Sequence, residues 1–189
     1  MSAYQLLWTP SHLQQVFGCL QAAFSRPGTL TRLEHPVGEF AIHYSILACL
    51  VDHQVSLHDA GDRLPRAFKN LLACQEAGSK SADFLFYSGD QTPGSAQHKV
   101  GRLSHPEMSS TLIVLVDDFN SVNANVRLTL SGPGIQASTQ LTVAGLNVEW
   151  LQLRNQQCAA FPLGNDYIFC SEHALMALPR STKLEFEVQ

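Results

Sequence analysis

Apolar residues in the first part of the chain recur at helical spacing. They lie three or four positions apart, which places them on one face of a helix: Leu13, Val16, Phe17, Leu20 and Phe24. Ser11 followed by Gln14 has the pattern of a capping box at the start of this helix. The sequence RPG at 26–28 predicts its end.

Between residues 41 and 90 the pattern predicts helices that alternate with short strands. Segment 41–52 is apolar enough for a buried helix, and 54–59 predicts a short strand. In 64–78, Pro65 suits the first turn of another helix and Gly78 predicts its end. Segment 82–90 then predicts a further strand. This alternation predicts a sheet covered by helices.

The second half of the chain is richer in strand patterns. After a polar stretch at 91–110, which predicts loop or weak helix, STLIVLVDDF at 110–119 has the continuous apolar character of a strand buried on both faces. Segments 125–132 and 135–143 alternate polar and apolar residues across a GPG turn, so they are expected to pair. A helix is predicted at 146–157, and three short strands at 166–189.

Composition narrows the class of protein. The 189 residues fit one domain, 1–189, with 45% hydrophobic and 15% charged residues, which is typical of a globular protein. A net charge of -4 offers no basic surface for nucleic acid. No apolar run approaches the roughly 20 residues that span a bilayer, and the start lacks a signal-peptide pattern. A cytoplasmic location without membrane contact is therefore expected.

The familiar catalytic and metal-binding patterns are missing. The five cysteines include no CxxC pair, and the eight histidines form no HExxH or HxH motif, so neither a disulfide framework nor a metal site is predicted. Serine-hydrolase, P-loop and dinucleotide signatures are also absent. The sequence therefore predicts no catalytic constellation of its own.

A lysine that forms a Schiff base with a cofactor needs an apolar setting that lowers its pKa. The chain has four lysines, all in polar surroundings: Lys69, Lys80, Lys99 and Lys183. No covalent pyridoxal cofactor, and no other cofactor, is expected.

Three segments punctuated by Gly and Pro remain as candidates for binding. In SRPG, Arg26 and Gly28 either just end the helix or take part in a site. In LSGPGI, Gly132 and Gly134 flank a proline; their free amides form either an anion-binding nest or a plain strand connection.

The third segment runs from Phe161 to Thr182 and contains FPLGND and PRST. Pro179 is typical of a sheet edge, so Arg180 is expected to leave the sheet interior and point toward solvent or a partner. With Ser181 and Thr182, its guanidinium would grip a phosphate or a partner's carboxylate, the alternative being a surface salt bridge. Asp166 in FPLGND is a further candidate, alongside its role in placing a strand.

Together these segments resemble the PhnH family, the H subunit of the bacterial carbon-phosphorus lyase system that degrades phosphonates. The similarity rests on FGCLQAAFSRPG, LSGPGI and FPLGNDYIFCSEHALMALPRST, in that order along nearly the whole chain. Gly18 stands where the family often has arginine, Phe24 replaces a common methionine, and Ser181 replaces a common threonine but keeps the hydroxyl. Any role of that arginine does not transfer to Gly18.

The resemblance implies an α/β fold with a mixed sheet flanked by helices, a three-layer sandwich similar to pyridoxal-phosphate-dependent transferases without the cofactor lysine. It implies a homodimer that assembles with the G, I and J subunits. With G, I and the ATP-binding-cassette-like L subunit, H takes part in displacing adenine from ATP by a phosphonate, which gives ribose 1-phosphonate 5-triphosphate. The later radical cleavage belongs to the iron-sulfur cluster of J, and the cysteines here are wrongly spaced to hold one.

Two functions therefore stay open. The chain is either an assembly subunit whose neighbours do the chemistry, or a direct contributor to a phosphonate or triphosphate site through Arg26, Arg180 and the 132–134 turn. A third possibility is an α/β domain with another ligand, which the lack of a common sheet between the middle and final strands would favour.

Overall fold

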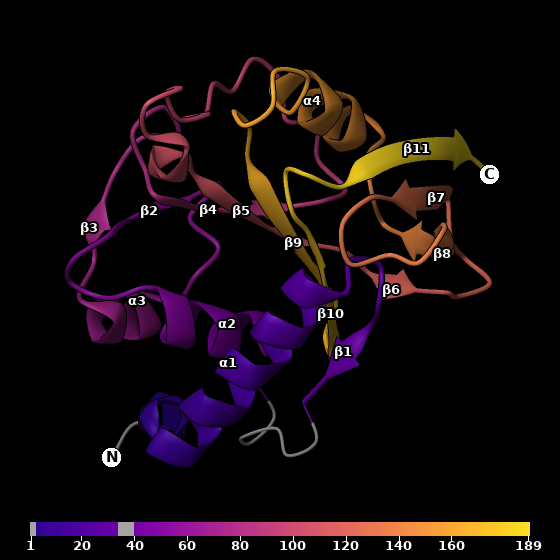
Figure 1. The fold of residues 1–189 in the computed structure, drawn as a ribbon. Helices are drawn as coiled ribbons and strands as arrows, with labels where there is room; N and C mark the ends of the chain where they lie inside the picture. The colour runs from indigo at the N-terminus through magenta and orange to yellow at the C-terminus, as the bar shows by residue number, and fades with distance from the viewer. Residues whose placement is uncertain (1–2, 34–39) are drawn as a thin grey trace.

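Two β-sheets organise the chain in the computed structural model, which describes residues 3–33 and 40–189 (Figure 1). The larger sheet has seven strands in the order β1-β10-β9-β5-β4-β2-β3. Its strands are β1 (Thr31–Arg32), β2 (Ser56–Asp59), β3 (Gln75–Glu76), β4 (Phe84–Ser88), β5 (Thr111–Leu115), β9 (Asp166–Cys170) and β10 (Ala174–Leu178). The strands from β9 to β3 are parallel, and β10 is antiparallel to both its neighbours. The predicted mixed sheet is thus confirmed.

The smaller sheet has four antiparallel strands in the order β11-β7-β8-β6. They are β6 (Asp118–Phe119), β7 (Val126–Ser131), β8 (Thr139–Ala144) and β11 (Lys183–Val188). The predicted pairing of the two segments across the GPG turn is confirmed by β7 and β8. Strand β11 pairs with β7, and β9 pairs with β5, so strands from the middle and the end of the chain lie together in each sheet. This arrangement argues against the third possibility, an α/β domain with another ligand.

Helices cover one face of the large sheet, and a mixed layer covers the other. Helices α1 (Pro10–Ser25), α2 (Ile42–Leu50) and α3 (Arg66–Leu72), with the short 3-10 helix η1 (Ala3–Trp8), pack against one face. The opposite face meets α4 (Glu149–Gln157) and the small sheet (Figure 1). Helices therefore lie on both faces of the large sheet, as predicted, but strands of the small sheet also cover part of the second face, which was not predicted. The 3-10 helix η2 (Pro106–Met108) lies in the long loop before β5.

Strand β5 shows how the sequence pattern produces this layering. Leu112 and Val114 belong to the core shared with α4 and the small sheet, whereas Ile113 between them belongs to the core beneath α1 and α2. Successive side chains of a strand point to opposite faces, so a strand buried on both faces needs apolar residues at every position. The continuous apolar run was therefore a correct signal of a central strand.

Several local boundaries differ from the predictions. Helix α1 begins at Pro10 after Thr9, and no side chain caps it, so the capping box of Ser11 and Gln14 is wrong. Helix α3 ends at Leu72 rather than Gly78, because Ala73 adopts a left-handed conformation and the chain then enters β3. Segment 110–119 is divided between β5 and β6, which belong to different sheets. None of the described helices is long and apolar enough to cross a membrane.

Candidate functional site

The three candidate segments meet at the turn that joins β7 to β8. A Cβ atom on Gly134, where φ is 83°, would lie 2.4 Å from the carbonyl oxygen of Ser25, so the SRPG segment packs directly on this turn. A Cβ atom on Gly132 would lie 3.1 Å from the carbonyl oxygen of Ser181, so the PRST segment touches its other end. Sequence positions more than 100 residues apart are thus brought together.

A hollow lies on each side of this turn. Arg26 and Gly134 line the first, of about 530 Å³, in which the Arg26 residue is exposed; Gly28 lies nearby against Thr139. The second, of about 520 Å³, is here named the arginine pocket. Its lining includes Pro133, Arg154, Phe161, Arg180, Thr182, Lys183 and Leu184. Of the predicted residues, Arg26 and Gly134 line the first hollow and Arg180, Ser181 and Thr182 the second. Gly28, Gly132 and Asp166 line neither, and the anion nest at 132–134 stays a prediction.

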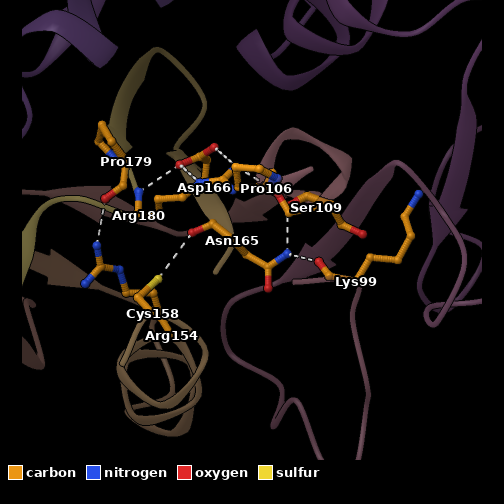
Figure 2. Close-up of polar contacts among 10 residues, drawn as sticks. Lys99, Pro106, Ser109, Arg154, Cys158, Asn165, Asp166, Pro179 and Arg180 are labelled. Carbon is orange, nitrogen blue, oxygen red and sulfur yellow. Dashed lines mark hydrogen bonds and ion pairs between the residues drawn. The ribbon is translucent and has the colours of Figure 1, made fainter. Parts of the chain in front are cut away.

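Arg180 points into the protein and not toward solvent or a partner, contrary to the prediction. Its Nη2 donates to Asp166 Oδ2 at 2.6 Å and its Nε to Asp166 Oδ1 at 3.3 Å, while its backbone N–H also donates to Oδ1 (Figure 2). Nη1 donates to the Pro106 carbonyl and Nη2 also to Ser109 Oγ, both at 2.6 Å. Its side chain is only 17% exposed. The guanidinium of Arg180 therefore already donates hydrogen bonds to acceptors of this chain.

Strand register explains why Arg180 meets Asp166. Tyr167 and Leu178 are partners in the antiparallel pair of β9 and β10, so the residues just outside them are also neighbours. Asp166 begins β9, and Arg180 follows β10 after Pro179. The Asp166 carboxylate, which is 22% exposed, therefore forms an ion pair within the chain. Arg180 and Asp166 thus form a salt bridge, the alternative left open by the sequence, which ties two strand ends to the loop at 106–109. A role for either residue in binding a ligand stays a prediction.

Arg154 on α4 is the cation that the sequence interpretation missed. Its residue is 2% exposed, and it donates from Nη2 to the carbonyl oxygens of Pro179 at 2.8 Å and Thr182 at 2.6 Å, as Figure 2 shows for Pro179. Nη1 donates to Asn155 Oδ1 at 3.3 Å, and Nε has no partner within the described residues. Across residues 3–33 and 40–189, no carboxylate pairs with it. Burial lowers the pKa of Arg154 because it disfavours the charged form.

The position of Arg154 on α4 carried a signal that was available in the sequence. Trp150 and Leu151 make the buried face of this helix, and residues three and four positions further on share that face. Arg154 is such a residue, so a charge stands where the helical pattern calls for an apolar side chain. A charged residue on the apolar face of a helix is rarely fully buried without a partner, and it is the feature that should have been singled out.

A neutral hydrogen-bonded chain joins the inner side of α4 to the large sheet. His98 Nε2 lies 3.1 Å from the Tyr87 hydroxyl, and Gln157 Nε2 lies 2.9 Å from His98 Nδ1. The Tyr167 hydroxyl donates to Gln157 Oε1 at 2.8 Å. Burial lowers the pKa of His98 to about 4, so its ring is neutral near pH 7. This chain of satisfied groups positions α4, and with it Arg154.

The lysines lie in ion pairs or at the surface. Lys69 faces Asp59 at 3.7 Å and Glu76 at 3.4 Å and is also paired with Asp62, in a cleft of about 600 Å³ beside α3 and β3. Lys99 is paired with Asp83, while Lys80 and Lys183 are exposed. Among the described residues, which omit His35, no cluster of three His, Cys, Asp or Glu side chains is arranged to hold a metal ion.

These features define a three-layer α/β domain whose most distinctive polar site is a pocket with a buried arginine that has no carboxylate in direct contact among the described residues. Residues 5–185 match the family model described as bacterial phosphonate metabolism protein (PhnH). The chain belongs to this family, and the resemblance found in its motifs is confirmed.

Two relatives extend this result. The chain is 31% identical over 181 residues to the "Putative C-P lyase subunit protein HtxG" of Stutzerimonas stutzeri, covering 96% of this chain and 90% of that protein. It is 30% identical over 184 residues to the alpha-D-ribose 1-methylphosphonate 5-triphosphate synthase subunit PhnH of Rhizobium meliloti (strain 1021), covering 92% of this chain and 90% of that protein. A role in phosphonate catabolism follows. The likeness to pyridoxal-phosphate-dependent transferases stays a prediction.

Proposed function

We propose that this chain is a subunit of a carbon-phosphorus lyase system, and that it is required with partner subunits to make ribose 1-phosphonate 5-triphosphate from ATP and a phosphonate. The observation that carries the proposal is the match along nearly the whole chain to a relative named as a subunit of the synthase of the methylphosphonate compound. A second relative, named as a C-P lyase subunit, supports the same assignment.

The chain's own contribution in this proposal is binding and not bond breaking. The reactants, a phosphonate and a triphosphate, are both phosphorus oxyanions, and arginine is well suited to such groups because it presents planar, bidentate donors. Arg154 is buried at the arginine pocket without a paired carboxylate among the described residues, which supports a pocket that receives an anion.

The partners proposed are a second copy of this chain and the G, I and J subunits, with the L subunit acting in the same step in the cytoplasm. Support comes from the word subunit in both relatives' names and from apolar side chains at the surface. Phe17 on α1 is 59% exposed, Leu103 is 76% exposed and Met108 is 56% exposed. Aromatic residues and methionine are enriched in protein interfaces, so these positions suit contact with other subunits.

A second candidate is a purely structural subunit with no part in substrate binding. The closure of Arg180 onto Asp166, Pro106 and Ser109 favours it, because the most prominent motif of the sequence then serves the fold and not a ligand. In this case the chain would contribute only the surface on which its neighbours assemble.

The decisive experiment reconstitutes the complex from purified subunits with and without this chain and measures adenine release from ATP. We expect release that depends on both the phosphonate and this chain, together with co-elution of the chain with its partners in gel filtration. Equal release without the chain would refute the proposed function, as would failure to join the complex. Adenine release by the isolated chain would refute its status as a subunit that needs partners.

A further inference from the structure

We propose that the arginine pocket binds the phosphorus oxyanion of an organic phosphonate or phosphate, with Arg154 Nε and Thr182 Oγ1 as its donors and the organic substituent against Phe161 and Pro133. This inference rests on the proposed function for the choice among anions. The site itself is inferred from the contacts and burial of this chain.

The first step is that the buried Arg154 has no direct charged partner among the described residues. A guanidinium has five N–H donors, and the acceptors recorded for Arg154 are two backbone carbonyls and one side-chain amide, none of which carries a net charge. Its Nε is buried and has no partner in the part of the chain that the structure describes. Buried charges in proteins are normally paired or neutralised, so a pocket that leaves this one unpaired is prepared for an anion.

The second step is a hydroxyl beside the guanidinium that also lacks a partner. Thr182 is 2% exposed, and its Oγ1 has no hydrogen-bond partner among the described residues. The backbone carbonyl of Thr182 accepts from Arg154 Nη2 at 2.6 Å, which holds the two residues together, and both line the arginine pocket. Both atoms are buried, so an oxyanion has to reach the floor of the pocket to satisfy the free N–H and the free O–H at once.

The third step is the character of the remaining wall. Phe161, which is 66% exposed, lines the pocket with Pro133 and Leu184, while Lys183 adds an exposed cation. No aspartate or glutamate lines it in the described part of the chain. A volume of about 520 Å³ lies within the roughly 300 to 1,000 Å³ typical of small-molecule sites and exceeds what a bare phosphate fills. A charged floor and an apolar wall suit a ligand with one anionic end and one organic end.

The other two hollows lack this combination. Arg26 in the neighbouring hollow is exposed, so its charge is already solvated. Lys69 in the cleft beside α3 is matched by Asp59, Asp62 and Glu76. Neither cation gains as much from a bound anion as the buried guanidinium of Arg154 does, because neither is both desolvated and unpaired.

The test measures binding of methylphosphonate, inorganic phosphate, tripolyphosphate and acetate to the full-length chain and to the assembled complex by calorimetry. We expect methylphosphonate to bind wild type, and Arg154→Gln, which keeps amide donors but removes the charge, to weaken it by about 10- to 100-fold. Thr182→Val keeps the side-chain shape and should weaken binding by about 5- to 10-fold. Arg102→Gln removes an exposed arginine outside the pocket and should leave binding unchanged.

The comparison of anions separates the possible sources of the ligand group. Tighter binding of methylphosphonate than of phosphate supports a phosphonate, and tighter binding of tripolyphosphate supports the triphosphate of ATP; both support the inference. Acetate binding as tightly as the phosphorus anions would overturn it in favour of a partner's carboxylate. Equal binding by wild type and Arg154→Gln, or no binding by wild type alone and in the complex, would also overturn it.

If Arg154→Gln does not fold, Thr182→Val still tests the site. Unchanged affinity for methylphosphonate in Thr182→Val overturns the role of the Thr182 hydroxyl. The outcome is distinguishable from failure of the proposed function. Adenine release that needs the chain but is unaffected in both variants removes only this site. Anion binding that depends on Arg154 in a chain that is dispensable for adenine release removes only the proposed function.

Discussion

Replacement of Arg180 by alanine tests whether this residue serves the fold. The change removes an ion pair in which the Nη2 of Arg180 lies 2.6 Å from Asp166 Oδ2, together with hydrogen bonds to Pro106 and Ser109. Among the described residues, it leaves the Asp166 carboxylate, 22% exposed, with only the backbone N–H of residue 180 as a donor. The protein should therefore lose stability through an uncompensated carboxylate.

The magnitude follows from burial and geometry. Breaking a fully buried ion pair costs about 3–5 kcal/mol, and exposed pairs contribute about 0–1 kcal/mol. Because the two side chains are 17% and 22% exposed, we expect Arg180→Ala to lower the free energy of unfolding by about 2–4 kcal/mol. For a chain of this size that corresponds to a fall in Tm of roughly 5–15 °C. Arg180→Lys should cost about 1–2 kcal/mol, because one ammonium cannot reproduce the planar fork.

Urea unfolding followed by circular dichroism measures these changes, with Arg102→Ala as the control for loss of an exposed arginine. Single and double replacements of Arg180 and Asp166 should show a coupling energy of about 1–3 kcal/mol. A loss below about 0.5 kcal/mol for Arg180→Ala would refute the reasoning, because the pair would then behave as a surface salt bridge. Loss of adenine release in a fully stable Arg180→Ala complex would instead restore the residue to a ligand site.

Two further predictions concern the backbone and two histidines whose pKa is lowered by burial. Gly134→Ala should lower the free energy of unfolding by about 1–3 kcal/mol, since φ is 83° and the new Cβ would lie 2.4 Å from a carbonyl oxygen. Gly18→Ala, at an exposed site in helix α1 where a Cβ meets nothing within 4 Å, should raise it by about 0.5–1 kcal/mol. Equal urea midpoints for the two variants would contradict both expectations. Burial lowers the pKa of His43 and of His98 to about 4, so the unfolded chain takes up protons first as pH falls below 6.5. Stability should be fully present above pH 6.5 and fall toward pH 4 by at most about 1.4 kcal/mol per pH unit for each histidine. A flat dependence of the urea midpoint between pH 7 and 5 would show that these rings are not buried as neutral groups.

The sequence by itself determined most of the secondary structure. The helical spacing from Leu13 to Phe24 and the continuous apolar run of β5 each report how many faces of an element are buried, which is a local property of the pattern. It also indicated the family, because the three motifs are local strings of residues that the family comparison confirmed. The ends of helices and strands were predicted less well. Helix α3, for example, ends just before Ala73, which adopts a left-handed conformation although it is not a glycine.

Only the tertiary structure decided which charges are free. Arg180 appeared in the sequence as an available cation, but the β9–β10 register supplies its carboxylate and a loop 74 residues away supplies a carbonyl. Arg154 was overlooked within a helix, and its surroundings leave it buried with carbonyl and amide acceptors alone. A side chain's ability to bind an anion depends on its desolvation and on its counter-ions, and both are set by residues that folding brings from far along the chain.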